Sequence, residues 1–159
     1  MSRILVVALS VLFVALPVQA ATQADTKTIT VRLISTTESS KTLVDRAPKL
    51  EASRGDVILV SSLLRNAVAQ FGQPKGAFVG SDNVVFTVVT TGRQADVRVE
   101  TSLPGGTLEA RGRTRLGRLQ TYPVTSGTGK FVHARGTGES RALGPSGNRR
   151  LKVYRLRLP

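Results

Sequence analysis

The sequence has 159 residues and contains neither cysteine nor tryptophan. Without thiols, no disulfide can hold the fold together, and zinc sites built on thiolates are excluded. A single histidine, His133, supplies too few ligands for a histidine-based metal site. No G-x-S-x-G motif accompanies it, so nothing indicates a serine hydrolase of the α/β type. We therefore expect neither a bound metal nor a cofactor.

Acidic and aromatic side chains are also scarce. The chain has 23 Lys and Arg against 10 Asp and Glu, a formal net charge of +13 at pH 7. Such an excess is typical of a protein that meets a polyanion, a membrane surface or an acidic ligand. Aromatic residues make up only 4% of the chain, whereas single-stranded nucleic acids are bound by stacking on exposed aromatics. Nucleic acid is therefore not the expected partner.

The first twenty residues have the pattern of a secretory signal peptide. A short basic start at Met1–Arg3 precedes an apolar run from Ile4 to Val18, and the small residue Ala20 ends the segment. The run is shorter than the roughly 20 residues that cross a bilayer. We predict cleavage near Ala20 and a secreted protein, extracellular or periplasmic, whose single domain spans residues 21–159. An uncleaved membrane anchor is the alternative.

Beyond this segment the pattern is strand-like almost throughout. Ile29, Val31 and Leu33 alternate with polar residues, which is typical of a strand with one buried face. Similar runs recur between short turns that contain glycine and proline, and no long helical pattern is found. We interpret residues 36–54 as part of a long polar loop and Ser81–Asn83 as a bend.

About eight such strands joined by hairpins predict an all-β fold with an antiparallel sheet. An open sheet of this size leaves two edges exposed, and closure into a barrel removes them. The predicted fold is therefore a closed eight-stranded antiparallel β-barrel of calycin-like architecture. A barrel of eight strands has room inside for packed side chains or one small ligand. An open sandwich is the second choice.

The positive charge is concentrated in the second half of the chain. From Arg93 onward there are fourteen Lys and Arg and only four Asp and Glu. Arg111, Arg113 and Arg115 alternate with apolar positions, so they share one outward face, and arginine suits bidentate binding of carboxylate or phosphate. This band is a candidate site for an anionic polymer, a lipid surface or a protein partner. The alternative is a solvated face, partly neutralised by Asp96 and Glu100 across the hairpin.

Residues 121–138, which read TYPVTSGTGKFVHARGTG, carry a more specific signal. Together with a final strand of the form x-Y-x-L-x-L, they resemble the dirigent and allene oxide cyclase barrel superfamily, over about residues 29–158. The resemblance implies a closed eight-stranded barrel with a largely apolar cavity, and assembly as a homodimer or homotrimer. The matching residues are Gly127, Thr128, Gly129, Phe131, Ala134, Arg135, Gly136, Tyr154, Leu156 and Leu158.

The motif also has a physical interpretation. Gly127 and Gly129 allow a tight turn with positive φ, after which Phe131 can plug one mouth of the barrel. The strand that follows has little side chain at Gly136 and Gly138, so it can approach its neighbours closely or leave space inside.

Members of that superfamily hold a small hydrophobic substrate or radical pair and steer its coupling or cyclisation, which is catalysis by positioning. The catalytic candidates in this chain are Arg135, Tyr122 and Asp56. Most acidic residues fall at outward strand positions or in loops, so no carboxylate is expected in the cavity. Alternation of strand faces gives the ligand-lining candidates, which are Phe78, Phe86, Val97, Val99, Leu108 and Tyr154.

Two functions remain open from the sequence. The leading hypothesis is a secreted barrel that binds a small apolar or amphipathic molecule in its interior and steers its cyclisation or coupling. The alternative is a non-enzymatic interaction protein that uses its arginine band. Whether a reaction is catalysed stays open; if one is, the resemblance implies an isomerase or cyclase of the allene oxide cyclase or dirigent type.

Overall fold

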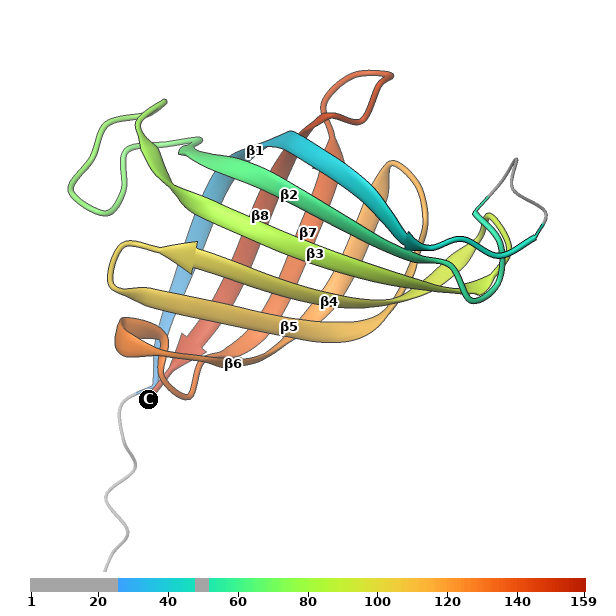
Figure 1. Ribbon diagram of the computed structural model, residues 1–159. Helices are drawn as coiled ribbons and strands as arrows, with labels where there is room; N and C mark the ends of the chain where they lie inside the picture. The colour runs from blue at the N-terminus through green and yellow to red at the C-terminus, as the bar shows by residue number, and fades with distance from the viewer. Residues whose placement is uncertain (1–25, 48–51) are drawn as a thin grey trace, which may run out of the picture.

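The computed structural model describes residues 26–47 and 52–159. These residues form eight antiparallel strands that close into a barrel in chain order (Figure 1), which confirms the predicted fold. The predicted signal peptide, residues 1–20, lies outside the described residues and stays a prediction. Within the described ranges, no helix is long and apolar enough to cross a membrane. The elements are β1 (Lys27–Val44), β2 (Val57–Asn66), β3 (Phe78–Thr90), β4 (Gln94–Leu103), β5 (Gly106–Arg115), β6 (Leu119–Gly127), the 3-10 helix η1 (Gly129–Phe131), β7 (Arg135–Ala142) and β8 (Arg149–Leu158).

Each strand pairs with its neighbours in the chain, and β1 also pairs with β8. That closing ladder runs from Lys27 opposite Leu158 to Thr36 opposite Arg149, so the start of β1 and the end of β8 lie side by side in Figure 1. Connections between successive antiparallel strands alternate between the two ends of a barrel. We call the end with the β7–β8 connection the β7–β8 end, and the opposite one, which carries η1, the β6–β7 end.

The side chains that point into the barrel change from apolar to polar along its axis. On β1, Leu33 is fully buried, and Ser35, the next inward residue, is buried as well. On β8, which runs in the opposite direction, Lys152 precedes Tyr154 and Leu156 in the same inward register. The aliphatic core therefore fills the β6–β7 end, and polar side chains gather towards the β7–β8 end.

Strand β1 is longer than the sequence pattern indicates. The predicted loop over residues 36–54 is wrong for residues 36–44, which continue β1 and pair with β2 as far as Val44 opposite Val57. The inward positions Ser35 and Thr37 line a polar part of the interior. The alternation of apolar and polar residues therefore disappears, although the backbone ladder continues.

The predicted bend at Ser81–Asn83 is also wrong, because polar residues again occupy a continuous strand. Strand β3 passes through these residues, and Asp82 is buried, with 1% of its surface exposed. Asp and Asn favour turns in general, but here Asn83 lies on the outer face and accepts a hydrogen bond of 2.8 Å from the Ser61 hydroxyl. A carboxylate therefore lies inside the barrel, although Asp82 is not among the residues that line the cavity described below.

Phe131 closes the β6–β7 end, as predicted, because its ring is buried in the aliphatic core. Gly129 has a φ of +56°, a left-handed conformation that glycine adopts readily. Gly127 does not have the predicted positive φ. A Cβ at Gly127 would lie 2.4 Å from the carbonyl oxygen of Phe131, so this glycine is required by close backbone approach instead.

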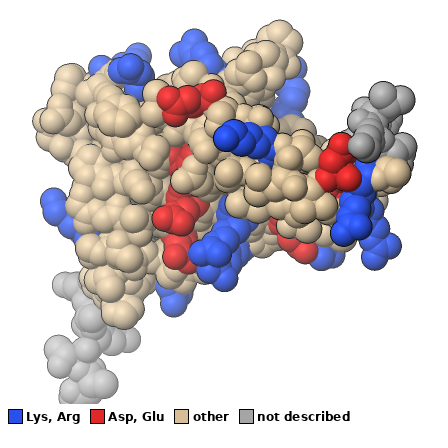
Figure 2. Space-filling model, viewed as in Figure 1, with Lys and Arg blue, Asp and Glu red and all other residues tan. Residues whose placement is uncertain are grey.

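On the outer face of β4 and β5, basic side chains are partly paired with acids. Arg113 donates a hydrogen bond of 2.9 Å to Asp96 across the hairpin, and Arg111 lies 3.4 Å from Glu109 of its own strand. Figure 2 shows acidic and basic groups intermixed on this side of the molecule. The predicted partnership of the band with Asp96 is confirmed, whereas Glu100 stands opposite Glu109 rather than an arginine.

Substitution of Gly138 by alanine is expected to destabilise the barrel. A Cβ at this inward position would lie 2.3 Å from Cε2 of Tyr122 and 3.0 Å from Cε1 of Tyr154. Overpacking of this kind costs about 1–3 kcal/mol of unfolding free energy. Urea denaturation followed by circular dichroism measures the loss. The outward Thr137→Ala is the matched control and should change stability by less than about 0.5 kcal/mol; equal midpoints for the two variants would contradict the packing described here.

Candidate functional site

A cavity of about 260 Å³ lies inside the barrel towards the β7–β8 end. Val60, Val84 and Phe86, from β2 and β3, form an apolar wall. Most of the remaining lining is polar, with hydroxyl groups from β1, β2 and β7 and residues of the β7–β8 connection. The volume is slightly below the roughly 300 Å³ of the smaller ligand sites in proteins. The cavity therefore suits one small molecule with an apolar and a polar side.

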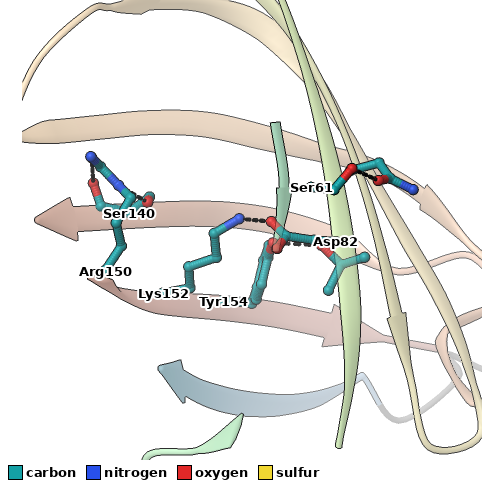
Figure 3. A network of polar contacts seen from close by, with 8 residues as sticks. Ser61, Asp82, Ser140, Arg150, Lys152 and Tyr154 are labelled. Atoms are coloured by element: carbon teal, nitrogen blue, oxygen red, sulfur yellow. Dashed lines mark hydrogen bonds and ion pairs between the residues drawn. The ribbon is translucent and has the colours of Figure 1, made fainter. Parts of the chain in front are cut away.

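An ion pair crosses the interior beside this cavity. Lys152 lines the cavity from β8 and reaches Asp82 of β3 (Figure 3). Both side chains are buried, with 4% and 0% of their surfaces exposed. Burial lowers the pKa of Lys152 to about 7, because an ammonium loses its hydration in the interior, while the adjacent carboxylate favours the charged form. Asp82 Oδ2 takes part in the pair, and Asp82 Oδ1 has no hydrogen-bond partner among the residues that the structure describes.

Two tyrosines lie next to the ion pair. The ring centroids of Tyr122, from β6, and Tyr154, from β8, are 6.5 Å apart. The Tyr154 hydroxyl shares a hydrogen bond of 2.8 Å with the Thr101 hydroxyl. The buried Tyr122 hydroxyl interacts with Tyr154 and makes no hydrogen bond of ordinary geometry within residues 26–47 and 52–159. Burial raises the pKa of Tyr122 to about 12. Tyr122 also lines the cavity, so it offers a neutral phenol that can donate a hydrogen bond to a ligand.

Arg150 holds a fixed positive charge at the same end. Its Nε donates to the Ser140 hydroxyl at 2.7 Å, a contact visible in Figure 3. Its Nη2 reaches the carbonyl oxygens of Gly117 and Arg118, each at 3.2 Å. These bonds tie β8 to β7 and to the β5–β6 connection. Arg150 therefore lines the cavity in one orientation.

These groups suit an organic ligand. Arg150 can pair with an acidic group, Tyr122 can donate a hydrogen bond, and Lys152 with Asp82 can give or take a proton. The apolar residues of the lining come from β2 and β3, whereas Tyr122 comes from β6 and Arg150 and Lys152 from β8. Across residues 26–47 and 52–159, no three His, Asp or Glu side chains are grouped as metal ligands would be.

The structure brings together only part of the site predicted from the sequence. Tyr122 and Phe86 line the cavity. Tyr154 is buried beside Tyr122 and is held by Thr101. The other interior candidates pack in the aliphatic core, namely Val97, Val99 and Leu108.

Three candidates lie away from the cavity. Arg135 is exposed at the start of β7, at the β6–β7 end, and donates to a neighbouring carbonyl at 2.9 Å. Asp56 is buried, but it accepts hydrogen bonds from the backbone of Arg46 and Ser53, at 2.6 and 2.7 Å, and so holds the β1–β2 connection. Phe78 is 57% exposed. A bulge where β3 meets β2 turns Val79 inward instead of Phe78.

Sequence reasoning missed three charged residues of the site, Asp82, Arg150 and Lys152. Strand parity was the signal that could have found them. Lys152 lies two positions before Tyr154, and Asp82 two positions before Val84, so each has the inward parity of a buried neighbour. Charged residues are seldom fully buried, so the residue types of Asp82 and Lys152 predict the outer face although their strand positions predict the inner one.

Comparisons with known proteins agree on the fold. No sequence-family profile and no curated protein sequence matches this chain. A solved structure of a pyocyanin demethylase matches with a TM-score of 0.63 and 20% identity, over 80% of this chain and 99% of the other. A pterocarpan synthase dirigent protein matches with a TM-score of 0.62 and 14% identity, over 86% and 87% of the two chains. An exo-specific intermolecular Diels-Alderase matches with a TM-score of 0.63 and 13% identity, over 85% and 100%.

The chain has the fold of the dirigent proteins. This agrees with the resemblance that the G-T-G-x-F-x-x-A-R-G motif carries. In this dirigent-type barrel, the motif builds the β6–β7 end, where Phe131 is buried. The polar cavity lies towards the other end of the interior.

The two tyrosines of this dirigent-type barrel should titrate abnormally. Burial raises the pKa of Tyr122 to about 12 and that of Tyr154 well above its usual value. We expect the near-ultraviolet phenolate absorbance of the folded protein to stay flat up to about pH 11, whereas both tyrosines of the denatured chain ionise near pH 10. The unfolded state releases these protons first, so stability should fall as the pH rises from about 10 towards 12. Half-ionisation near pH 10 in the folded protein would contradict this placement.

Proposed function

We propose that this protein binds a small amphipathic molecule inside its barrel and steers a cyclisation or rearrangement of that molecule. The observation that carries the proposal is the two-sided lining of the cavity. Val60, Val84 and Phe86 form the apolar side, and Tyr122, Arg150 and Lys152 are among the polar groups of the other. A ligand with one apolar and one polar part fits such a lining in a single orientation.

Positioning would supply most of the effect on such a ligand. A flexible molecule that is already held in one reactive conformation loses no further conformational entropy when it reaches the transition state. Tyr122 would donate a hydrogen bond to an oxygen on which charge develops. The pair of Lys152 and Asp82 would accept or return one proton.

Two proteins of this fold support the proposal. One is a pterocarpan synthase and another is a Diels-Alderase, so a barrel of this form can host ring-forming chemistry. The present chain has a cavity inside the same fold, lined by polar groups that are held in place.

Blocking the cavity should abolish ligand binding. Ser62 faces the cavity and its chain neighbour Ser61 lies on the outer face. With the amphipathic dye 1-anilinonaphthalene-8-sulfonate as probe, Ser62→Leu should weaken binding by about tenfold or more, equivalent to about 1.4 kcal/mol. Ser61→Leu is the matched control and should keep the parent affinity. Fluorescence titration of the folded proteins measures both.

Undiminished dye binding by folded Ser62→Leu would overturn the proposal. If binding is lost as expected, compounds that displace the dye become substrate candidates. Chiral chromatography of the mixture then tests for the formation of one stereoisomer.

An anionic surface is a second candidate partner, and a different set of arginines favours it. On the outer face of β7 and β8, Arg135 stands opposite Arg157, and both are exposed. Among the described residues, neither forms an ion pair with a carboxylate, whereas Glu139 pairs with Arg141 and Arg155. In the predicted band, Arg111 and Arg113 have their own acids, whereas Arg115 is exposed and forms no ion pair among the described residues.

Retention on a heparin column distinguishes the two faces. The double variants Arg135→Glu/Arg157→Glu and Arg111→Glu/Arg113→Glu change the net charge equally. We expect the first to elute at clearly lower salt than the second, because it removes arginines that no carboxylate neutralises. Equal elution of both variants would show that retention reflects net charge alone.

A further inference from the structure

Lys152 differs from the other lysines of this chain. Of the lysines in the described ranges, it is the one whose side chain is buried inside the barrel, and Lys27, Lys41, Lys75 and Lys130 are exposed. It also lines the cavity, and its amine reaches Asp82 next to that cavity. An amine inside a ligand-sized cavity is a potential nucleophile towards carbonyl compounds.

The surroundings of Lys152 supply the proton transfers that such chemistry needs. Asp82 is in direct contact with Nζ and can take its proton. Tyr122 lines the same cavity, and its buried hydroxyl interacts with Tyr154 and makes no hydrogen bond of ordinary geometry within the described residues. Arg150, the other cation of the lining, keeps its charge and is held by Ser140.

We propose that Lys152 forms a Schiff base with small aldehydes or ketones that enter the cavity. Asp82 takes a proton from the ammonium, and the neutral nitrogen adds to the carbonyl carbon. A second proton passes from that nitrogen to the oxygen, so that the C=O bond becomes C–OH. The hydroxyl leaves as water with the proton returned by Asp82, and the C=N bond forms as a protonated imine beside the Asp82 carboxylate. One ammonium and one carbonyl compound give one protonated imine and one water, without an oxidant or reductant.

Burial supports this role. It lowers the pKa of Lys152 to about 7, so a large share of the amine is neutral at neutral pH. A solvent-exposed lysine has a pKa near 10.4 and is less than about 0.1% neutral under the same conditions. Lys152 is therefore expected to react with carbonyl compounds faster than the surface lysines, because more of its amine is neutral and because it lines the cavity.

Reductive trapping tests the proposal. The folded protein is incubated at pH 7 with butanal and sodium cyanoborohydride, and the alkylated lysines are mapped by peptide mass spectrometry. We expect Lys152 to be labelled about tenfold faster than Lys41 or Lys130, and this preference to disappear in denaturant, where all lysines have similar pKa values. Labelling of Lys152 no faster than the surface lysines would overturn the proposal.

The pH profile of labelling separates a reactive amine from a merely accessible one. The rate at Lys152 should rise through about pH 7 and then level off, whereas the rates at the surface lysines should keep rising towards pH 10. Asp82→Asn keeps the amine but removes the carboxylate, and should slow labelling of Lys152 relative to Lys130. Parallel profiles for Lys152 and the surface lysines would also overturn the proposal, whether or not Asp82→Asn folds.

The inference rests on the proposed function only in that small molecules must enter the cavity. Dye binding tests that entry independently. Dye binding that is blocked by Ser62→Leu, combined with no preferential trapping at Lys152, would leave the proposed function intact and refute the Schiff base. Dye binding that Ser62→Leu leaves undiminished, combined with no preferential trapping at Lys152, would refute both the proposed function and the Schiff base. Lys152→Met is the control that must lose the Lys152 label while the surface lysines keep theirs.

Discussion

Pairing of β1 with β8 is the constraint on which the rest of the structure depends. This ladder joins the beginning and the end of the described chain, from Lys27 opposite Leu158 onward. It satisfies the backbone groups that would otherwise form two exposed edges. It also creates an inside, in which Leu33 of β1 stands opposite Lys152 of β8. The aliphatic core and the polar cavity are two halves of the interior that this closure encloses.

The polar half of that interior is costly to build. Burial of two charges costs several kcal/mol per ion, and a buried pair is often no more stable than well-packed apolar residues of similar volume. The ion pair of Asp82 and Lys152 is therefore not expected to stabilise the fold relative to apolar residues at the same positions. Within the described part of the chain, Asp82 Oδ1 has no hydrogen-bond partner, a further cost in a buried site. The proposed chemistry on a bound molecule would account for these costs.

Much of the fold was predictable because local patterns carry it. Alternation at Ile29, Val31 and Leu33 and the glycine-rich turns indicated strands and hairpins, and the removal of sheet edges favoured closure. The candidate site was harder to predict. Tyr122 and Phe86 were found because they are aromatic residues with inward parity, whereas Asp82 and Lys152 were missed because charged residues normally mark an outer face. Phe78 was misplaced by one bulge, which reverses the parity of a strand without any clear sequence signal.

The sequence by itself determined most of the strands and the turns between them, because these depend on residues close together in the chain. It did not determine the second half of β1, the middle of β3 or the face of Phe78. The tertiary structure alone decided which charges are buried and which charges pair between strands distant in the sequence. Lys152 meets Asp82, and Arg135 stands beside Arg157 rather than an acid, only through strand register and closure. The energy of a charge depends on the groups across from it and on the water it loses. Both are set by segments that lie far apart in the sequence.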